Sequence, residues 1–413
     1  MTNLKRKLIT GIASGAILLN ALTPFAFADT TIQISGNGSS SDNTANVSFD
    51  QSTTVVQNNT ANVSNNVDVD ADTGDNDAED NTGGDVSIET GDADVDVDVS
   101  NTLNSNSANV DCCQTGDTEV LIQGNGTNSD NDANLNLTTD TGVFQDNYAY
   151  VKNDVDVDAD TGNNDAKDNT GGDVTIETGD ADVSVSLATT ANANWAQVGS
   201  SGQNGDISLR ILGNGSNSDN TIKLWLDNSV LLAQNNSAYI HNDVDVDADT
   251  GDNDAEDNTG GDVTIETGDA NVDVDVDNAV NFNWADVNCG CLLEDLLAKI
   301  DGNGTDSDND INAWLSFNQG EEGSFQDNDA YIDNDLDDLD ADTGNNDNED
   351  NTAEGDGDPS IETGDADVDV DVNNSGNVNV LGGDSDFEWP DFNFDVEFSL
   401  SLSELLALLG LLG

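Results

Sequence analysis

The chain has 413 residues, of which 85 are acidic and only eight are lysine or arginine, giving a formal net charge of −77. This charge argues against nucleic acids and anionic membrane surfaces as partners, because binding either requires basic patches. The one histidine, His241, cannot form a histidine-rich metal centre, and nothing in the sequence marks it as the partner of a nucleophile, so we expect no enzyme activity. Disorder is the alternative that such a composition raises, and the regular repeats described below oppose it.

The N-terminal residues 1–28 have the features of a secretory signal peptide. Residues 5–7 are basic, residues 8–22 are apolar, and residues 26–28 form an Ala-x-Ala cleavage site. The apolar run is short for a membrane span, and no later segment is long enough for one. We therefore expect cleavage after Ala28 and a secreted or cell-surface protein. Five basic residues then oppose the 85 acidic ones, a net charge of about −80.

A long repeat organises the rest of the chain. The triplet Gly-Asn-Gly begins at Gly36, Gly124, Gly213 and Gly302, in steps of 88, 89 and 89 residues. The runs Asp-Ala-Asp-Thr-Gly and Ile-Glu-Thr-Gly-Asp-Ala recur in the same order in each copy. Such a period indicates an array in which each unit buries its apolar face against its neighbours. The domains that we predict are a signal peptide (1–28), repeat 1 (29–118), repeat 2 (119–207), repeat 3 (208–296), repeat 4 with short insertions (297–386) and an apolar C-terminal segment (387–413).

Within each copy, apolar and acidic residues alternate. Val67, Val69 and Ala71 fall on one side of an extended chain, and the intervening aspartates 68, 70 and 72 fall on the other. Period 2 is typical of a strand with one buried face, and the Gly-Asp, Thr-Gly and Asn-Gly pairs supply turns. The sequence therefore predicts an all-β fold, a β-solenoid of stacked short strands built from four copies.

A finer spacing of alanines suggests the size of a coil. Ala45, Ala61, Ala78, Ala93 and Ala108 lie 15 to 17 residues apart. On this basis we expect about five coils per copy and about 18 to 20 in all, which at about 4.8 Å per coil make a rod of about 90 Å.

One motif resembles the repeats of curlin-type secreted fibre proteins, which carry Gly-x-x-Asn-x-Ala-x-Val-like runs. The similarity lies in four runs, at residues 57–63, 145–151, 234–240 and 326–332. The resemblance implies an extracellular β-solenoid that can assemble into fibres. This chain departs from that family in its acidity and in its 88-residue copies.

The acidic runs are candidate calcium sites. Hard cations take several oxygen ligands, and Asp-x-Asp-x-Asp runs supply them, although the spacing of an EF-hand loop is not met. The candidate metal ligands are Asp68, Asp70, Asp72, Asp75, Asp156, Asp158, Asp160, Asp245, Asp247, Asp249, Asp340 and Asp342. The alternative is a solvated acidic face that keeps the protein soluble. Repulsion of about 0.8 kcal/mol between carboxylates about 5 Å apart in water favours bound Ca²⁺.

Four cysteines occupy equivalent places in two copies, at Cys112, Cys113, Cys289 and Cys291. With five coils per copy, the two pairs would lie about 45 to 50 Å apart, beyond disulfide reach. We expect local bridges or cross-links between chains, which an exported protein permits.

The C-terminal segment alternates phenylalanine with polar residues from Phe392 and ends in a leucine-rich run. It fits either a cap over the end of the solenoid or a strand for assembly. Together these features predict an exported acidic structural repeat protein of the cell surface or extracellular matrix. Its expected partners are divalent cations, further copies in filaments and other surface components. The alternative is an adhesin, a binding module that presents a ligand face on a β-solenoid stalk.

Overall fold

The computed structural model describes residues 6–14, 18–21, 30–110, 117–199, 206–288, 296–318, 323–353 and 359–382. Within these ranges the regular elements are all β-strands, and no helix is long and apolar enough to cross a membrane. The predicted all-β class is therefore confirmed.

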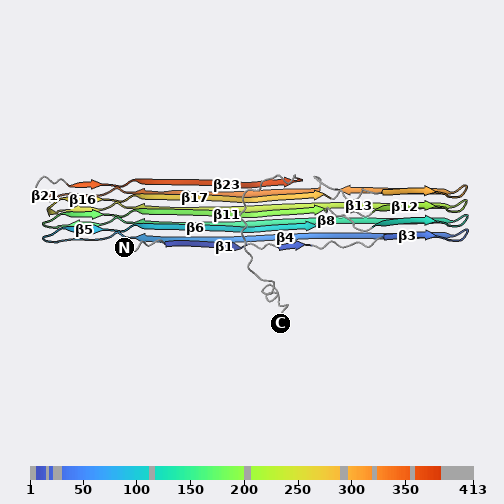
Figure 1. Ribbon diagram of the computed structural model, residues 1–413, viewed down its shortest axis with the longest axis horizontal. Coiled ribbons are helices and arrows are strands. Elements are labelled where there is room, and N and C mark those ends of the chain that lie inside the picture. The colour runs from blue at the N-terminus through green and yellow to red at the C-terminus, as the bar shows by residue number, and fades with distance from the viewer. Residues whose placement is uncertain are drawn as a thin grey trace, which may run out of the picture. The chain divides into compact units, whose positions relative to one another are not determined.

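Strands that pair lie one repeat apart in the sequence (Figure 1). Thr30 pairs with Thr118, Asp70 with Asp158, and Ala181 with Ala270, always in parallel. We call the four stacked segments rung 1 (30–110), rung 2 (117–199), rung 3 (206–288) and rung 4 (296–382). This stack of parallel strands is the predicted solenoid-like architecture.

Each rung contains four main stretches of strand, and each stretch pairs with the corresponding stretch of the neighbouring rungs to form a sheet. The first sheet contains β3 (Thr30–Ser35), β7 (Thr118–Gln123), β12 (Ile207–Leu212) and β18 (Leu296–Asp301). The second contains β4 (Asp42–Asp72), β8 (Asp130–Asp160), β13 (Asp219–Asp249), β19 (Asp308–Asn318) and β20 (Ser324–Asp342).

The return half of each rung forms the other main sheets. One contains β5 (Val86–Glu89), β10 (Val174–Glu177), β16 (Val263–Glu266) and β22 (Ser360–Glu362). Another contains β6 (Ala93–Val110), β11 (Ala181–Gly199), β17 (Ala270–Asn288) and β23 (Ala366–Leu381). Short strands pair between them: β9 (Asp165–Lys167) with β14 (Asp254–Glu256), and β15 (Thr259–Gly260) with β21 (Thr352–Ala353). Two N-terminal strands, β1 (Arg6–Ser14) and β2 (Leu18–Ala21), pair with β6.

The coil size predicted from the alanines is wrong. One 88-residue copy makes a single wide coil, not five, and its strands are long, not short: β4, β8 and β13 each have 31 residues. A strand of that length extends about 100 Å, whereas four rungs rise only about 14 Å from first to last. The predicted rod of about 90 Å and its 18 to 20 coils are therefore replaced by a short stack of very long rungs.

The alanine spacing has a different cause from the one that we expected. Ala45 and Ala61 lie on the same strand, and their even spacing places both on its inward face. Ala93 and Ala108 are 15 residues apart, yet both are buried, because Asn104 adopts a left-handed backbone (φ 55°) and reverses the alternation. The same break recurs at Asn192 and Asn281.

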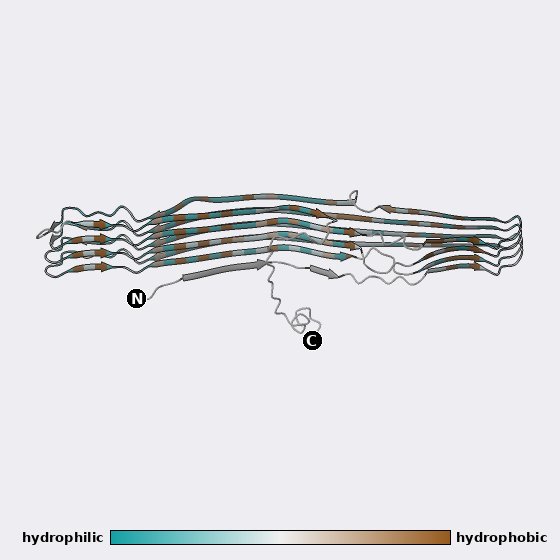
Figure 2. Ribbon diagram, turned by 45° about the horizontal axis from the view of Figure 1, so that its top comes forward, coloured by the Kyte–Doolittle hydropathy of each residue, from teal (hydrophilic) through white to brown (hydrophobic). Residues whose placement is uncertain are grey.

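The core lies between two layers: the second sheet (β4, β8, β13, β19 and β20) and the sheet of β6, β11, β17 and β23. Val67, Val155 and Val244 of one layer pack with Val97 and Val185 of the other. Figure 2 shows hydrophobic and hydrophilic residues alternating along the long strands. In rung 1, Val69 and Ala71 are half-buried against this core and the intervening aspartates are exposed, so the predicted inward and outward faces are confirmed.

Asparagine side chains form ladders inside the same core. The amide of Asn59 donates to Asn147 (3.0 Å), Asn147 donates to Asn236 (3.0 Å), and Asn236 donates to Asn328 (3.0 Å). Within this ladder each rung therefore satisfies a buried amide of the next, as buried polar groups require.

Candidate functional site

The predicted metal ligands lie where the second sheet ends, at the last residues of β4, β8, β13 and β20. Here aspartate alternates with inward valine, leucine or alanine, so the carboxylates share the outward face. In-register pairing then places aspartate beside aspartate in successive rungs. Three lines of carboxylates result, which we call the acidic columns: Asp68, Asp156, Asp245 and Asp338; Asp70, Asp158, Asp247 and Asp340; Asp72, Asp160, Asp249 and Asp342.

The acidic columns form a grid of like charges. Neighbours within a column are one rung apart, about 4.8 Å, and neighbouring columns are two residues apart along the strand, about 6.7 Å. Two carboxylates at the shorter spacing repel by about 0.9 kcal/mol in water. A cation that sits between rungs can take oxygens from two or more aspartates, which is the chemistry that Ca²⁺ prefers.

The outermost column is anchored by turns. An Oδ1 atom of Asp160 accepts a hydrogen bond from the Gly162 amide (2.6 Å), and Asp72 and Gly74 repeat the contact (2.7 Å). Glycine is required two residues after this aspartate because the backbones of neighbouring rungs come close together at that position. A Cβ atom on Gly162 would lie 1.9 Å from the carbonyl oxygen of Gly251.

Burial and mutual repulsion raise the pKa values of the inner carboxylates. The pKa of Asp158 is raised from 3.8, first by burial and then by the charges of Asp247 and Asp70. The pKa of Asp247 is raised in the same way, by burial and then by Asp340. These carboxylates therefore hold their charge at a free-energy cost that a bound cation or proton relieves.

Asp249 shows the largest shift in the columns. Its pKa is raised from 3.8 to about 7, mainly by burial and also by the charges of Asp160, Asp252 and Asp342. The hydrogen bond from the Gly251 amide (2.5 Å) stabilises the charged form and opposes the shift. This aspartate therefore exchanges protons near neutral pH.

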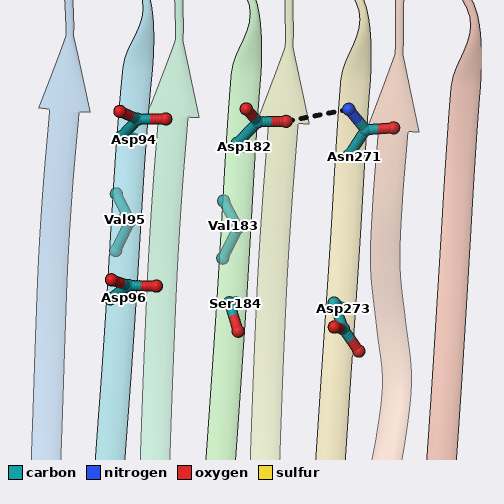
Figure 3. Close-up of a pocket in the computed structure, with 8 residues that line it drawn as sticks. All are labelled: Asp94, Val95, Asp96, Asp182, Val183, Ser184, Asn271 and Asp273. Carbon is teal, nitrogen blue, oxygen red and sulfur yellow. Dashed lines mark hydrogen bonds between the residues drawn. The ribbon is translucent and has the colours of Figure 1, made fainter. Parts of the chain in front are cut away.

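The opposite sheet carries a weaker version of the same pattern (Figure 3). In one column across the rungs, Asp94 and Asp182 are followed by Asn271, whose amide donates to Asp182 (2.8 Å). In the next column, Ser184 stands between Asp96 and Asp273. Neutral residues thus dilute the charge on β6, β11 and β17. The acidic columns have aspartate in every rung and are the stronger candidate.

A second acidic group lies just beyond the turn. Carboxylate oxygens of Asp254, Glu256 and Asp347 all come within 4.8 Å of one another, a spacing that suits a metal ion. In the rung below, Lys167 lies 2.8 Å from Asp254 and 3.0 Å from Asp165, and these contacts raise the pKa of the lysine. Lys167 therefore acts as a built-in cation in this part of the stack.

Sequence reasoning missed this carboxylate triad and one member of the columns. Lys167 pairs in register with Glu256, so the exchange of lysine for glutamate between copies was the available signal. Asp338 was missed because an irregularity in β20 shifts the register, so that Asp243 pairs with Asp335 but Asp245 pairs with Asp338.

Some predicted residues do not join the site. Asp75 lies outside the columns: it stands in the turn with a left-handed backbone (φ 56°), and its amide donates to the carbonyl of Gly162 (3.2 Å). The four cysteines, the cleavage site and the C-terminal segment 387–413 lie outside the described residues. The five-coil premise behind the expected separation of 45 to 50 Å is wrong, because strands two copies apart, such as β6 and β17, lie two rungs, about 10 Å, apart.

Comparison with known proteins gives no relative for this architecture. No family model matches the sequence, and neither the curated proteins nor the solved structures contain a significant match.

Proposed function

We propose that this protein is an exported, acidic structural protein of the cell surface or extracellular matrix whose acidic columns bind divalent cations, Ca²⁺ among them. The observation that carries the proposal is the register that brings aspartate beside aspartate along the stack, as in Asp70, Asp158, Asp247 and Asp340. Export is proposed from the basic, apolar and Ala-x-Ala features of residues 1–28.

A structural role fits the way in which the chain uses its residues. Backbone pairing and asparagine ladders hold the rungs together, and carboxylates cover the outward faces. Cations between the rungs would convert repulsion along the columns into cross-links. The protein would then be most stable in a medium that contains divalent cations, as extracellular fluids do.

The experiment compares thermal unfolding in CaCl₂ and in NaCl at matched ionic strength. We expect Ca²⁺ to raise the melting temperature more, because a ligand that binds only the folded state stabilises it beyond screening. In an Asp158→Asn, Asp247→Asn variant, this calcium-specific gain should shrink. An Asp96→Asn, Asp273→Asn variant, which loses two charges from the interrupted column, serves as the control and should keep the gain.

Equal stabilisation by the two salts would leave only a solvated acidic face. Loss of the calcium-specific gain in both double variants would show that total charge, and not the acidic columns, controls stability.

A second candidate function is the adhesin, and exposed aromatic side chains favour it. Trp225 is 53% exposed and stacks on Trp314, with ring centroids 5.4 Å apart. Large exposed aromatic side chains are typical of binding surfaces. A ligand would then bind the outward face of β13 and its neighbours, while the acidic columns stabilise the stalk.

A further inference from the structure

The outward face of the second sheet holds aromatic rings in columns. Tyr150, Tyr239 and Tyr331 stack with centroid distances of 5.0 and 4.9 Å. The ring planes of Tyr150 and Tyr239 differ by only 4°. The centroid distance matches the rise of one rung, about 4.8 Å. One flat ring therefore fills the height of one rung on this face.

A neighbouring column lacks one ring. Val56, Phe144, Ala233 and Phe325 are successive register partners, so the methyl group of Ala233 lies between two phenylalanines. An open pocket of about 730 Å³ lies over this alanine, and Phe325 is 59% exposed. The two phenylalanines are two rungs apart, about 9.6 Å, which leaves the height of a single flat group between them. We call this pocket the ring slot.

The rim of the ring slot is acidic. Asp146 and Asp327 line it from the next outward position along the strands, and Asn235 lies between them. The amide of Asn235 donates to Asp146 (2.7 Å), which fixes that carboxylate beside the slot. The slot thus combines two aromatic side chains with two carboxylates.

These features select a flat cation. A guanidinium group is planar, stacks on aromatic faces and pairs with carboxylates through two N–H groups. An ammonium group is compact and strongly hydrated and cannot fill a flat slot in this way. A neutral ring would gain nothing from the carboxylates, and the charge of −77 favours cationic partners throughout.

We propose that the ring slot binds the guanidinium group of an arginine side chain from a basic protein partner, between Phe144 and Phe325 and beside Asp146 and Asp327. This interaction goes beyond the proposed function, which needs only inorganic cations in the acidic columns. It provides a recognition site on the face of β8, β13 and β20.

The test titrates the full-length protein, carrying fluorine-labelled phenylalanine, with acetyl-arginine methylamide at high salt. The matched probes are acetyl-lysine methylamide and acetyl-phenylalanine methylamide. We expect the arginine probe to shift two phenylalanine signals saturably, which Phe144→Leu and Phe325→Leu assign, and to bind about tenfold more tightly than either matched probe. Ala233→Phe, which completes the aromatic column without changing the charge, should abolish the saturable shift.

Ser237→Phe is the control, because it adds the same ring to an outward position of the same strand and leaves the ring slot open. It should bind the arginine probe as the unaltered protein does. Unchanged binding in Ala233→Phe would overturn the proposal, as would equal binding of the lysine probe. Equal binding of the phenylalanine probe would show a neutral ring site and would also overturn it. The proposed function is unaffected by these outcomes, because the melting experiment with Ca²⁺ does not involve the slot.

Discussion

At the scale of single residues, position in the alternation decides the environment of each side chain. Val157 is 1% exposed, while its neighbours Asp156 and Asp158 are exposed members of the acidic columns. The same two residue types therefore build the core and the charged face. The chemistry of the outer face depends on how closely these aspartates approach those of the next rung.

The raised pKa values predict that acid stabilises the fold over a defined range. A carboxyl group whose pKa is 3.8 when unfolded and about 7 when folded binds protons more readily in the folded state between these values. Stability should therefore rise as the pH falls from about 7 toward about 4, and should fall as the pH rises through 7. Melting temperatures measured in a calcium-free pH series check this.

Asp249→Asn is the matched variant for the pH series. It removes the charge with the largest shift and keeps the shape of the side chain, so it should raise the melting temperature at pH about 8 and weaken the dependence on pH. A melting temperature that drops steadily as the pH falls from 7 would contradict the assigned cause.

At the scale of strands, ladders of identical side chains hold one rung to the next. Asn147 is buried and donates to both Asn236 (3.0 Å) and Asn194 (2.9 Å). It also accepts from Asn59 (3.0 Å). Because every rung repeats this asparagine, the two inner members of the ladder, Asn147 and Asn236, have partners in the rungs above and below.

Asn147→Ala should destabilise the fold by roughly 2 to 4 kcal/mol, because it leaves buried partners without hydrogen bonds. Asn134→Ala is the control, since Asn134 donates to Asn46 (2.7 Å) in an exposed ladder. That change should alter the free energy of unfolding by less than about 0.5 kcal/mol. Denaturant titration measures both, and equal costs for the two variants would show that buried ladders add no particular stability.

The strand pattern was predictable from the sequence, whereas the coil was not. Alternation identified Val67, Val69 and Ala71 as inward, whereas the in-register stacking of successive copies was not predicted. The alanine spacing misled because both a 16-residue and an 88-residue offset place alanine beside alanine. Choosing between them requires non-local information, namely which strands pair, and the left-handed Asn104 that reverses the alternation is not a signal that period 2 can reveal.

At the scale of the whole stack, the last rung leaves its inward side chains partly uncovered. Val368, Val370 and Val372 are 42, 41 and 40% exposed, whereas their partners in rung 3 are at most 2% exposed. At the other end, β1 and β2 pair with β6 and place Arg6 at the register position of Val95.

Stacking of rung 4 on rung 1 of a second molecule would cover both edges, because the same residue types would meet in register. We predict that the protein without residues 1–28 self-associates, and that Ca²⁺ strengthens the association by bridging the acidic columns. Sedimentation velocity measures this. Val370→Lys should weaken it, whereas Asn373→Lys, which adds the same charge to the outward face of β23, should not. A monomer in all calcium concentrations would contradict edge stacking.

The measurement that tests the rung architecture most directly is disulfide trapping in a variant without the four native cysteines. Asp156 and Asp245 are register partners in adjacent rungs, about 4.8 Å apart, so Asp156→Cys with Asp245→Cys should form a disulfide on oxidation. Asp140 and Asp156 lie on the same strand, about 53 Å apart, so Asp140→Cys with Asp156→Cys should not cross-link within one molecule. Cross-linking of the second pair without the first would show short coils of about 16 residues and would contradict the account of one copy per rung.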